Sequence, residues 1–375
     1  MNVLIIGGEV SGDMHGARLI SELNKINQGI NFIGIGGDKM IAAGLNALYH
    51  ISEMSFLGFY EVIRHLPFIF IVKRRVLKIA KEKNIKLAIL IDYPGFNLSI
   101  AKSLKKVDIK IVYYISPQIW AWGKRRLKKI EKIVDKMLVV FPFEKDFYST
   151  SDLNVEFVGH PLIERLNENS FMPKDTFFKK NNLQFDQEIL LLMPGSRKHE
   201  IKLILPAILP AAIKLAQKHN MQIALAINEN IELNLFEKYL DKNIKLISGN
   251  TYELLKYSKF GIIKSGTSTL EAALIGLPFV VVYKISFLSY IIGKMLISIR
   301  NIAIPNIILG KTVVPELIQG KLNTTKLVST VEYYLNDEKN ILAMLSELDK
   351  IKAILGQKNA AIESAKIISG ILNEQ

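Results

Sequence analysis

Short runs of apolar and β-branched residues alternate along the chain with longer segments whose apolar positions recur at helical spacing. After an opening run at 2–6, the first half of the chain carries such runs at 33–37, 87–91, 109–114, 136–140 and 156–158. The second half carries them at 189–193, 222–227, 244–247, 260–264 and 279–283. Such runs are typical of buried parallel strands, and the helical segments between them complete βαβ units. The alternation predicts an α/β protein with two Rossmann-like domains, each built on a parallel sheet.

A polar stretch with little periodicity, 167–186, separates the two sets of runs and predicts the domain boundary. A chain of 375 residues also exceeds what a single hydrophobic core usually serves. We predict an N-terminal domain at 1–165, a C-terminal domain at 186–340, and C-terminal helices at 341–375. We expect these last helices to pack back toward the N-terminal domain or against a partner subunit. The two sheets would face each other across a cleft lined by the carboxyl ends of their strands, where open parallel sheets bind ligands.

Three loops that end a predicted strand and begin a predicted helix are candidate anion sites. They read GGEVSGDMHG at 7–16, PGSR at 194–197 and SGTST at 265–269. Unpaired backbone N–H groups and the positive end of the helix dipole favour anions at such positions. An ordinary turn closed by a helix cap is the alternative, and in the first loop Ser11 or Asp13 would be the cap. The first loop matches neither the dinucleotide fingerprint nor a P-loop, which disfavours a nicotinamide oxidoreductase.

Several side chains on or beside these loops carry suitable chemistry. Arg197 would bind a diphosphate through two parallel hydrogen bonds, unless it only covers the protein surface. Glu271, in the helix after the third loop, would accept a hydrogen bond from a ribose or sugar hydroxyl. His15, one turn into the first helix, would act on substrate or have a structural role, and the pattern leaves both open.

Two further loops follow strands of the first domain. Asp92 ends the strand in LIDYPGFN at 90–97, where catalytic carboxylates often lie, with a turn-capping role as the alternative. The loop at 113–122 carries the only two Trp residues of the chain, Trp120 and Trp122, and a basic run follows it. Flat apolar rings beside cations suit a sugar or a phosphorylated lipid head group. Anchoring of the core, beside a solvated basic helix, is the alternative.

An apolar stretch at 54–72 precedes the basic run at 73–75, in a chain of net charge +14. A segment lying in a membrane interface, with its cations on the lipid head groups, would explain both features. An ordinary core helix is the alternative. No apolar run is long enough to span a bilayer, and the closest, 285–304, is interrupted by Lys294 and Arg300. The predicted membrane-docking side chains are Phe56, Phe59, Phe68, Ile69 and Phe70.

Several function classes are disfavoured by what the sequence lacks. The chain has no Cys, which excludes disulfides and cysteine zinc sites and agrees with a cytoplasmic location. Its six His form no H-x-x-x-H pair, so we predict no metal site and no cofactor. The first residues predict a strand and not a signal peptide. No RNA-binding aromatic motif or zinc finger is visible, so we expect no nucleic-acid partner despite the charge.

Nine motifs, in the same order along nearly the whole chain, resemble the lipid-A-disaccharide synthase family. They are GEVSGDMHGA at 8–17, GIGG at 34–37, MSFLG at 54–58, IDYPGFN at 91–97, SPQIWAW at 116–122, GHP at 159–161, PGSR at 194–197, SGT and LE within 265–271, and PN at 305–306. The departures from the family pattern are small: Val10 in the first motif, and Tyr-Pro-Gly at 93–95.

The resemblance implies an inverting glycosyltransferase of the GT-B fold, peripheral on the inner face of the cytoplasmic membrane. It would join UDP-2,3-diacylglucosamine to 2,3-diacylglucosamine 1-phosphate (lipid X), giving the β-1,6-linked lipid A disaccharide 1-phosphate and UDP. The expected partners are these two substrates and an anionic membrane surface, with a second copy of the chain, in a homodimer, as a further candidate.

Two alternative functions remain beside this one. Another GT-B enzyme would use a UDP-N-acetylglucosamine-type substrate, but the Trp-x-Trp loop and the apolar stretch at 54–72 argue against it. A non-catalytic membrane-surface protein would need neither Asp92 nor Arg197.

Transfer with inversion needs a base for the acceptor hydroxyl and groups that hold the charge developing on the diphosphate. The resemblance carries Asp92 over as the base, with His15 and Glu9 as further catalytic candidates. The predicted acceptor-binding residues are Ser11, Gly12, Trp120, Trp122, Arg125 and Arg126. The predicted UDP-binding residues are Gly195, Ser196, Arg197, Ser265, Gly266, Thr267, Ser268, Glu271, Asn306, Glu316 and Gln319.

Overall fold

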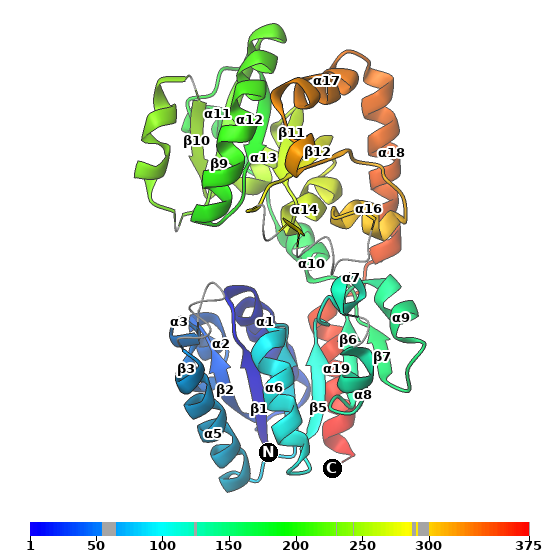
Figure 1. The fold of residues 1–375 in the computed structure, drawn as a ribbon. Coiled ribbons are helices and arrows are strands. Elements are labelled where there is room, and N and C mark those ends of the chain that lie inside the picture. The colour runs from blue at the N-terminus through cyan, green and yellow to red at the C-terminus, as the bar shows by residue number, and fades with distance from the viewer. Residues whose placement is uncertain are drawn as a thin grey trace. The chain divides into compact units, whose positions relative to one another are not determined.

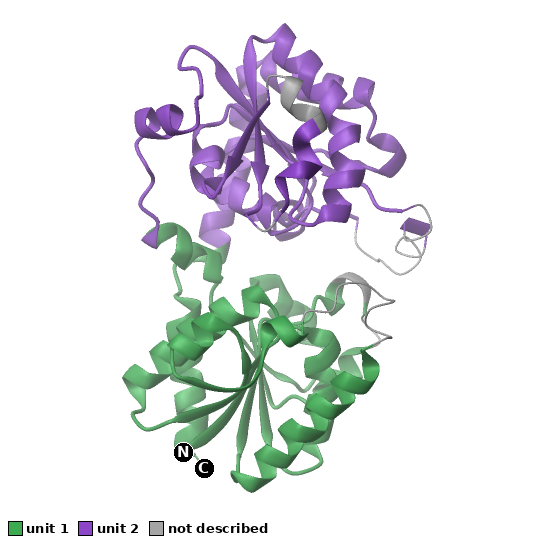
Figure 2. Ribbon diagram, turned by 90° about the vertical axis from the view of Figure 1, so that its left-hand side faces the viewer, with its two compact units in different colours: residues 1–167, 355–375 green, residues 168–354 purple. Residues whose placement is uncertain are grey.

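The computed structural model of the protein describes residues 1–54, 65–123, 126–229, 231–242, 244–286, 290–291 and 300–374. The chain divides into two compact units, which have different colours in Figure 2. Unit 1 comprises Met1–Asn167 and Leu355–Gln375, and unit 2 comprises Glu168–Ile354. Each unit is built on its own parallel sheet packed between helices (Figure 1), which confirms the predicted pair of Rossmann-like α/β domains.

Unit 1 contains a seven-stranded parallel sheet in the order β3-β2-β1-β4-β5-β6-β7. Its strands are β1 (Asn2–Gly7), β2 (Asn31–Gly36), β3 (Leu45–His50), β4 (Leu87–Ile91), β5 (Lys110–Tyr114), β6 (Lys136–Val139) and β7 (Asn154–Phe157). From β1 the chain adds strands on one side, and from β4 onward it adds them on the other. The order therefore reverses between β1 and β4, and this switch point is where open sheets of this kind bind ligands.

Helices of unit 1 cover the two faces of this sheet. They are α1 (Val10–Ile26), α2 (Asp38–Ala42), α3 (Ile51–Met54), α5 (Leu66–Glu82), α6 (Pro94–Lys105), α7 (Ile119–Trp122), α8 (Leu127–Glu131), α9 (Pro142–Tyr148), α10 (Pro161–Glu168) and α19 (Ala360–Asn373). The C-terminal helix α19 lies against α1, where Ser369 Oγ donates to Asn27 Oδ1 at 2.8 Å. Glu164 on α10 joins the same region, because it accepts from Arg18 and from the backbone N–H of Ala361.

Unit 2 contains a six-stranded parallel sheet in the order β10-β9-β8-β11-β12-β13. Its strands are β8 (Glu188–Met193), β9 (Met221–Ile227), β10 (Ile244–Ser248), β11 (Phe260–Lys264), β12 (Phe279–Tyr283) and β13 (Glu316–Ile318). Its helices are α11 (Lys174–Lys180), α12 (Lys198–Lys218), α13 (Thr251–Tyr257), α14 (Thr267–Ile275), α16 (Ile304–Leu309), α17 (Thr324–Leu335) and α18 (Glu338–Leu355), with 3-10 turns at Leu233–Lys242 and Gln319–Lys321. Here the switch point lies between β8 and β11.

The apolar runs predicted as strands lie within or overlap strands of the structure, and the central strands are almost fully buried, as β4 and β11 illustrate. Two strands escaped prediction, β3 and β13, and both lie at the edge of their sheet. Edge strands are covered on fewer sides, so their sequences, LNALYH and ELI, keep polar residues and lack a continuous apolar run. None of the helices in the described ranges is both long enough and apolar enough to cross a membrane.

Candidate active site

In unit 1, the loops after β1 and β4 adjoin because these strands are paired neighbours, with Gly7 opposite Ile91. The Tyr93 ring packs directly over Gly8, where an added Cβ atom would lie 2.2 Å from the ring. The Tyr93 hydroxyl donates to the Met54 carbonyl at 3.2 Å. Only glycine at position 8 lets the two loops approach this closely, so the motif GEVSG and the motif IDYPG form one surface.

Asp92 is the first residue after β4, and its backbone is held in a left-handed conformation with φ +46°. Its N–H donates to the Tyr114 carbonyl at 2.9 Å. Its own carbonyl accepts from the Tyr113 hydroxyl at 2.6 Å and from Asn97 Nδ2 at 2.8 Å. These hydrogen bonds hold Asp92 in an unfavourable backbone conformation. Such conformations are often found at functional residues.

The Asp92 carboxyl group has the electrostatics expected of a base. Burial, with a contribution from the nearby Glu9 carboxylate, raises its pKa to about 6, although a hydrogen bond from the Tyr93 backbone acts in the opposite direction. A carboxyl group with this pKa is ionised at neutral pH yet is a much better proton acceptor than an exposed aspartate. Glu9 itself is exposed beside it.

No side chain caps the helix that follows the first loop, although an ordinary capped turn was the alternative to an anion site. Glu9 is the N-cap residue of α1 and no side chain caps the helix, so the alternative in which Ser11 or Asp13 is the cap is wrong. Asp13 instead accepts from the backbone N–H groups of Gly37 at 2.7 Å and Met40 at 2.9 Å, at the start of α2. Such long-range capping cannot be read from local sequence, because donor and acceptor are 24 or more residues apart. Ser11 is exposed and Gly12 is buried.

Two histidines lie near this edge of the sheet. Burial, together with the charges of Arg165 and Arg18, lowers the pKa of His15 to about 4. Burial also lowers the pKa of His160 to about 3, with a contribution from His15. His160 Nδ1 accepts from the Leu162 N–H at 3.1 Å, so the neutral ring carries its proton on Nε2. Both imidazoles are therefore neutral at pH 7, and sequence reasoning missed His160 although it lies in the GHP motif.

The Trp loop follows β5, next to β4. Trp120 is 9% exposed, and its indole N–H donates to the buried Glu144 carboxylate at 3.2 Å. Its placement corresponds to the core-anchoring alternative. Trp122 ends α7, and Arg126 is exposed. The predicted residues Arg125, Phe56 and Phe59 lie outside the described residues.

In unit 2, the loops after β8 and β11 adjoin in the same way, with Met193 opposite Ile263. Glu200, in the first turn of α12, connects them. It binds Lys264 Nζ at 2.9 Å, lies 3.9 Å from Arg197, and accepts from the Ser196 N–H at 3.2 Å. The switch point of unit 2 therefore gathers two cationic side chains around one carboxylate.

The third predicted loop has the geometry of an anion site. Gly266 is the N-cap of α14, has φ +156° and leaves the helix start without a side-chain cap. Thr269 Oγ1 donates to the Gly266 carbonyl at 2.7 Å, and Ser265 Oγ donates to the Ile302 carbonyl at 2.8 Å. These bonds fix the loop while the first N–H groups of the helix stay available to a ligand. Gly195 in the neighbouring loop has φ +126°, so both loops depend on glycine.

The predicted UDP-binding residues outside these loops make hydrogen bonds to other residues of unit 2. Asn306 is fully buried, and its amide donates to the Val314 carbonyl at 2.8 Å and to Glu316 at 2.9 Å. Glu316 also accepts from the Ile302 and Ala303 N–H groups. Glu316 is the first residue of β13.

The remaining two side chains of this group also have partners inside the unit. Gln319 exchanges hydrogen bonds with the backbone of Ile285, accepting at 2.8 Å and donating at 3.0 Å. Tyr252 donates to Glu271 at 3.5 Å. Ser268 lies in the first turn of α14, beside Thr267. These contacts make Asn306, Glu316 and Gln319 supports of the neighbouring loops.

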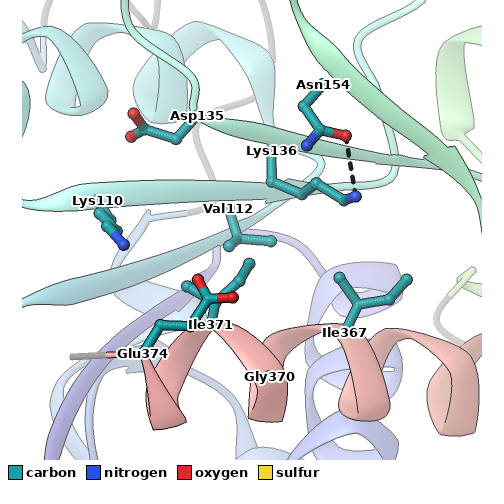
Figure 3. A pocket seen from close by; sticks show the side chains of 9 residues that line it. All are labelled: Lys110, Val112, Asp135, Lys136, Asn154, Ile367, Gly370, Ile371 and Glu374. Carbon is teal, nitrogen blue, oxygen red and sulfur yellow. Dashed lines mark hydrogen bonds between the residues drawn. The ribbon is translucent and has the colours of Figure 1, made fainter.

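A separate hollow of about 360 Å³ lies at the opposite edge of the sheet of unit 1 (Figure 3). It is lined at the amino ends of the strands by Lys110 and Lys136, and by α19. Lys136 Nζ is already bound to Asn154 at 2.9 Å. Because parallel sheets of this type bind ligands at their carboxyl edge, we assign this hollow no part in the reaction. Among the described residues, no group of three or more His, Asp or Glu is arranged to hold a metal ion.

Comparison with known proteins agrees with the two-unit geometry. A sequence profile described as lipid-A-disaccharide synthetase matches residues 3–369. The lipid-A-disaccharide synthase of Anaeromyxobacter sp. (strain K) is 37% identical over 375 residues, covering 99% of this chain and 97% of its own. That of Syntrophus aciditrophicus (strain SB) is 39% identical, covering 97% and 96%. The chain belongs to the lipid-A-disaccharide synthase family. It is therefore a glycosyltransferase of lipid A biosynthesis.

Solved structures of more distant proteins share the fold. The UDP-GlcNAc 2-epimerase from Neisseria meningitidis, bound to UDP-GlcNAc, has a TM-score of 0.65 at 14% identity and covers 100% of both chains. A glycosyltransferase from Rickettsia africae has a TM-score of 0.60 at 12% identity, covering 100% of this chain and 99% of its own. At such identities the likeness concerns the fold alone, and it confirms the predicted GT-B type.

Proposed function

We propose that this member of the family joins UDP-2,3-diacylglucosamine to 2,3-diacylglucosamine 1-phosphate, forming the β-1,6-linked disaccharide 1-phosphate and UDP. The observation that carries the proposal is Asp92, a partly buried residue at the switch point of unit 1 whose carboxyl group has a raised pKa, in a chain of this family. Unit 1 is the acceptor- and lipid-binding domain in this proposal, and unit 2 is the UDP-sugar-binding domain.

The proposed reaction consists of one proton transfer and one displacement. The ionised Asp92 carboxylate takes the proton of the acceptor hydroxyl as its oxygen forms a bond to the anomeric carbon of the donor. The bond from that carbon to the diphosphate oxygen breaks on the opposite face, and UDP leaves with the electron pair. Inversion at the anomeric carbon follows from this geometry. Glu9 supports the base, since a second negative charge raises the proton affinity of Asp92.

Unit 2 supplies the groups that hold the leaving diphosphate. Arg197 and Lys264 bring two positive charges to the loop after β8, and Glu200 fixes both. The open start of α14 after Gly266 adds backbone N–H donors and the positive end of the helix dipole. Charge that develops on the diphosphate is stabilised by groups already in place.

The test is an incubation of the purified protein with the two diacylated substrates, following UDP release and the disaccharide product together. We expect stoichiometric formation of both. UDP-N-acetylglucosamine, which lacks the second acyl chain, serves as the control donor and should give far less product. A protein that turns over or epimerises UDP-N-acetylglucosamine while leaving the diacylated donor intact would contradict the proposal.

We also propose that α5 docks unit 1 on an anionic membrane. Because α5 leads into β4 by a short turn, its first residues lie at the carboxyl edge of the sheet, the edge that carries Asp92. Leu66, Phe70 and Ile71 there are more than half exposed, with Phe70 at 67%. Exposed apolar side chains at this edge of the sheet suit a reaction whose substrates are lipids.

The rest of α5 divides into a core side and a basic side. Phe68 and Ile69 are half-buried against the core, as in the core-helix alternative, and the Phe68 ring meets Tyr49 edge-on at 5.9 Å. The helix then continues with exposed Arg74 and Lys78. Cations that follow exposed apolar residues on one helix match the head groups that lie above a lipid interior.

Replacing Leu66, Phe70 and Ile71 together by Ser tests this docking surface. We expect a folded variant that no longer sediments with vesicles containing phosphatidylglycerol. Phe68→Ser is the matched control, which should lower stability by about 2–4 kcal/mol through lost packing. Salt should weaken vesicle binding of the wild type without abolishing it, because the apolar contacts persist. A triple variant that binds vesicles like the wild type would contradict the docking surface.

A homodimer stays a prediction, which sedimentation of the purified protein over a range of concentrations would check. A single monomer mass at all concentrations would contradict it.

A further inference from the structure

One residue beside Asp92 has a backbone conformation that its side chain disfavours. Ile115, directly after β5, has φ +65°. A β-branched residue in this region is a genuine outlier, and such a conformation costs roughly 1–3 kcal/mol. The other non-glycine residues with positive φ in the described ranges are Asn, Asp, Tyr or Gln. A conformation of this kind persists only where the surrounding contacts impose it.

Hydrogen bonds hold Ile115 and the residues that follow it, and two of those bonds end at Glu144. The Ile115 N–H donates to the Leu138 carbonyl at 3.0 Å, which fixes one side of the turn. The next residue, Ser116, donates through Oγ to Glu144 at 2.7 Å, and the Trp120 indole N–H donates to the same carboxylate oxygen at 3.2 Å. The other oxygen accepts from the Val140 and Phe141 N–H groups at 3.2 and 3.1 Å. Glu144 is 1% exposed.

Two of these bonds cap the start of a helix, and the other two reach further. Glu144 is the third residue of α9, and it accepts from the N–H groups of Val140 and Phe141 before the helix, as the glutamate of a capping box does. The bonds to Ser116 and Trp120 reach across to the loop after β5, 28 and 24 residues away in the chain. That loop borders the base, because the Asp92 N–H donates to the Tyr114 carbonyl at 2.9 Å. A capping carboxylate therefore also holds the strained loop beside the catalytic edge.

We propose that Glu144 is a positioning residue for the acceptor, which fixes the loop at 115–122 through its hydrogen bonds to Ser116 and Trp120. The proposal rests on the proposed function, in which unit 1 binds the acceptor, and on the prediction that residues of this loop contact it. Glu144 acts through the loop and touches no reacting atom.

The chemistry of the four bonds explains why a carboxylate is required. All four partners are donors, and an ionised carboxylate is the side chain that only accepts. A Gln side chain would place an NH₂ group against donors on one of its two sides. The indole N–H of Trp120 cannot reverse its role, whereas the Ser116 hydroxyl can rotate. Glu144→Gln keeps size and shape, so it removes the acceptor chemistry specifically.

Burial makes this contact sensitive to pH. It raises the pKa of Glu144 to about 7, although Ser116, Phe141, Trp120 and Val140 all stabilise the ionised form. Protonation turns one accepting oxygen into a donor, so one bond of the set is lost as the pH falls through about 7. The loop is then expected to loosen.

The two Trp residues of the chain both lie in this loop, so their fluorescence reports on it without any substrate. In a Trp122→Phe protein, Trp120 is the only emitter. We expect its emission to titrate near pH 7 and this titration to disappear when Glu144→Gln is added. Emission that stays constant through pH 7 in the Trp122→Phe protein, or a titration that survives Glu144→Gln, would overturn the proposal. Neither outcome depends on the enzyme's substrates, so a failure of the proposed function is seen separately.

Steady-state kinetics give a second test of the positioning role of Glu144. In Glu144→Gln we expect the acceptor KM to rise about tenfold, with UDP affinity unchanged and kcat changed far less. Trp120→Phe keeps the ring beside Phe143, at 5.1 Å, and removes one bond, so about a threefold rise is expected even if Glu144→Gln folds poorly. The double variant should be no worse than Glu144→Gln alone. An unchanged acceptor KM in either folded single variant would overturn the proposal.

Asp135→Asn is the matched structural control. Asp135 accepts from the Ile111 N–H at 2.8 Å and pairs with Lys105, but it lies at the amino edge of the same sheet, beside the hollow in Figure 3. We expect it to lose stability and to keep the wild-type acceptor KM. A rise in KM equal to that of Glu144→Gln would mean that loss of stability alone is responsible, and the positioning role would fall.

Discussion

Asp92 and Glu200 are carboxylates of the two different units, yet their environments shift their pKa values in opposite directions. Each lies beside the switch point of its sheet. Burial raises the pKa of Asp92 to about 6, and the Glu9 carboxylate adds to the effect. Burial also acts to raise the pKa of Glu200, but Lys264, with help from Arg197 and the Ser196 N–H, lowers it overall. The groups beside Glu200 outweigh its burial, whereas the carboxylate beside Asp92 acts in the same direction as burial.

The difference fits the two tasks of a glycosyl transfer. An acceptor site needs a carboxylate that takes a proton readily, and a raised pKa provides this. A diphosphate site needs cations held at fixed positions, and a carboxylate that stays ionised holds them. In the proposed function, each unit supplies its groups beside the switch point of its own sheet, and a few side chains distinguish the two sites.

The largest expected effect comes from Asp92→Asn. Loss of the base should lower turnover by about two to four orders of magnitude while UDP binding stays near normal. Turnover with the diacylated substrates and UDP affinity by calorimetry measure the two quantities. Glu200→Gln is the matched comparison, and it should mainly weaken UDP binding. Near-normal turnover in Asp92→Asn would remove this residue from the mechanism.

A smaller effect is expected from Arg197→Ala. UDP binding should weaken by roughly 1.5–3 kcal/mol, the range for a hydrogen bond to a charged group. Lys198→Ala removes the neighbouring cation, which is exposed and lies 3.5 Å from Glu232, and should leave UDP affinity unchanged. A chelator should not affect either protein. Activity that disappears in chelator and returns with a divalent cation would show that the cationic side chains do not act alone.

Catalysis and UDP binding should also differ in how they depend on pH, because the pKa values of Asp92 and Glu200 are shifted in opposite directions. Because Asp92 must be ionised to accept a proton and its pKa is near 6, kcat/KM should fall about tenfold per pH unit below that value. UDP binding to the isolated enzyme should show no such step near pH 6, since the pKa of Glu200 is lowered. A rate that stays constant down to pH 5 would be inconsistent with Asp92 as the base.

The smallest expected effect concerns stability. The pKa of Asp92 is higher in the folded protein than the ordinary value of 3.8, so the ionised form opposes folding above pH 6 and the penalty vanishes below about 4. Asp92→Asn should therefore be more stable than the wild type at pH 8, by roughly 1–3 kcal/mol, and equal to it near pH 3.5. Denaturant unfolding at both pH values measures the difference. A destabilised variant at pH 8 would show that the Asp92 carboxylate stabilises the folded protein.

Much of the fold was accessible from the sequence, because buried parallel strands are continuous apolar runs. The strands with neighbours on both sides, such as β4 and β11, were predicted to within a residue or two. The edge strands β3 and β13 were not, since partial exposure leaves polar residues in them. Loops rich in glycine marked both switch points, because only glycine permits the approach of Gly8 to Tyr93 and the φ of Gly195.

The supporting residues of the site could not be predicted in the same way. Glu144, Glu200 and Asp13 each bind groups that local sequence does not place beside them, and their roles depend on how strands pair. In the sequence, Glu144 is the third residue of a helix that begins at Pro142, a position where a capping glutamate is common. Its second pair of bonds, to Ser116 and Trp120, follows from the pairing of β5 with β6. Tertiary contacts, and not residue patterns, carry that information.

The most direct test of the account is the titration of the Asp92 carboxyl group itself, followed by carbon-13 NMR in protein labelled at aspartate side chains, with Asp92→Asn identifying the signal. The midpoint of this titration should lie near pH 6 and should coincide with the fall in kcat/KM. In a Glu9→Gln protein the midpoint should move down, because one of the two causes of the raised pKa is removed. A midpoint at or below 3.8, the ordinary value for aspartate, would contradict the claim that this edge of unit 1 prepares Asp92 as a base.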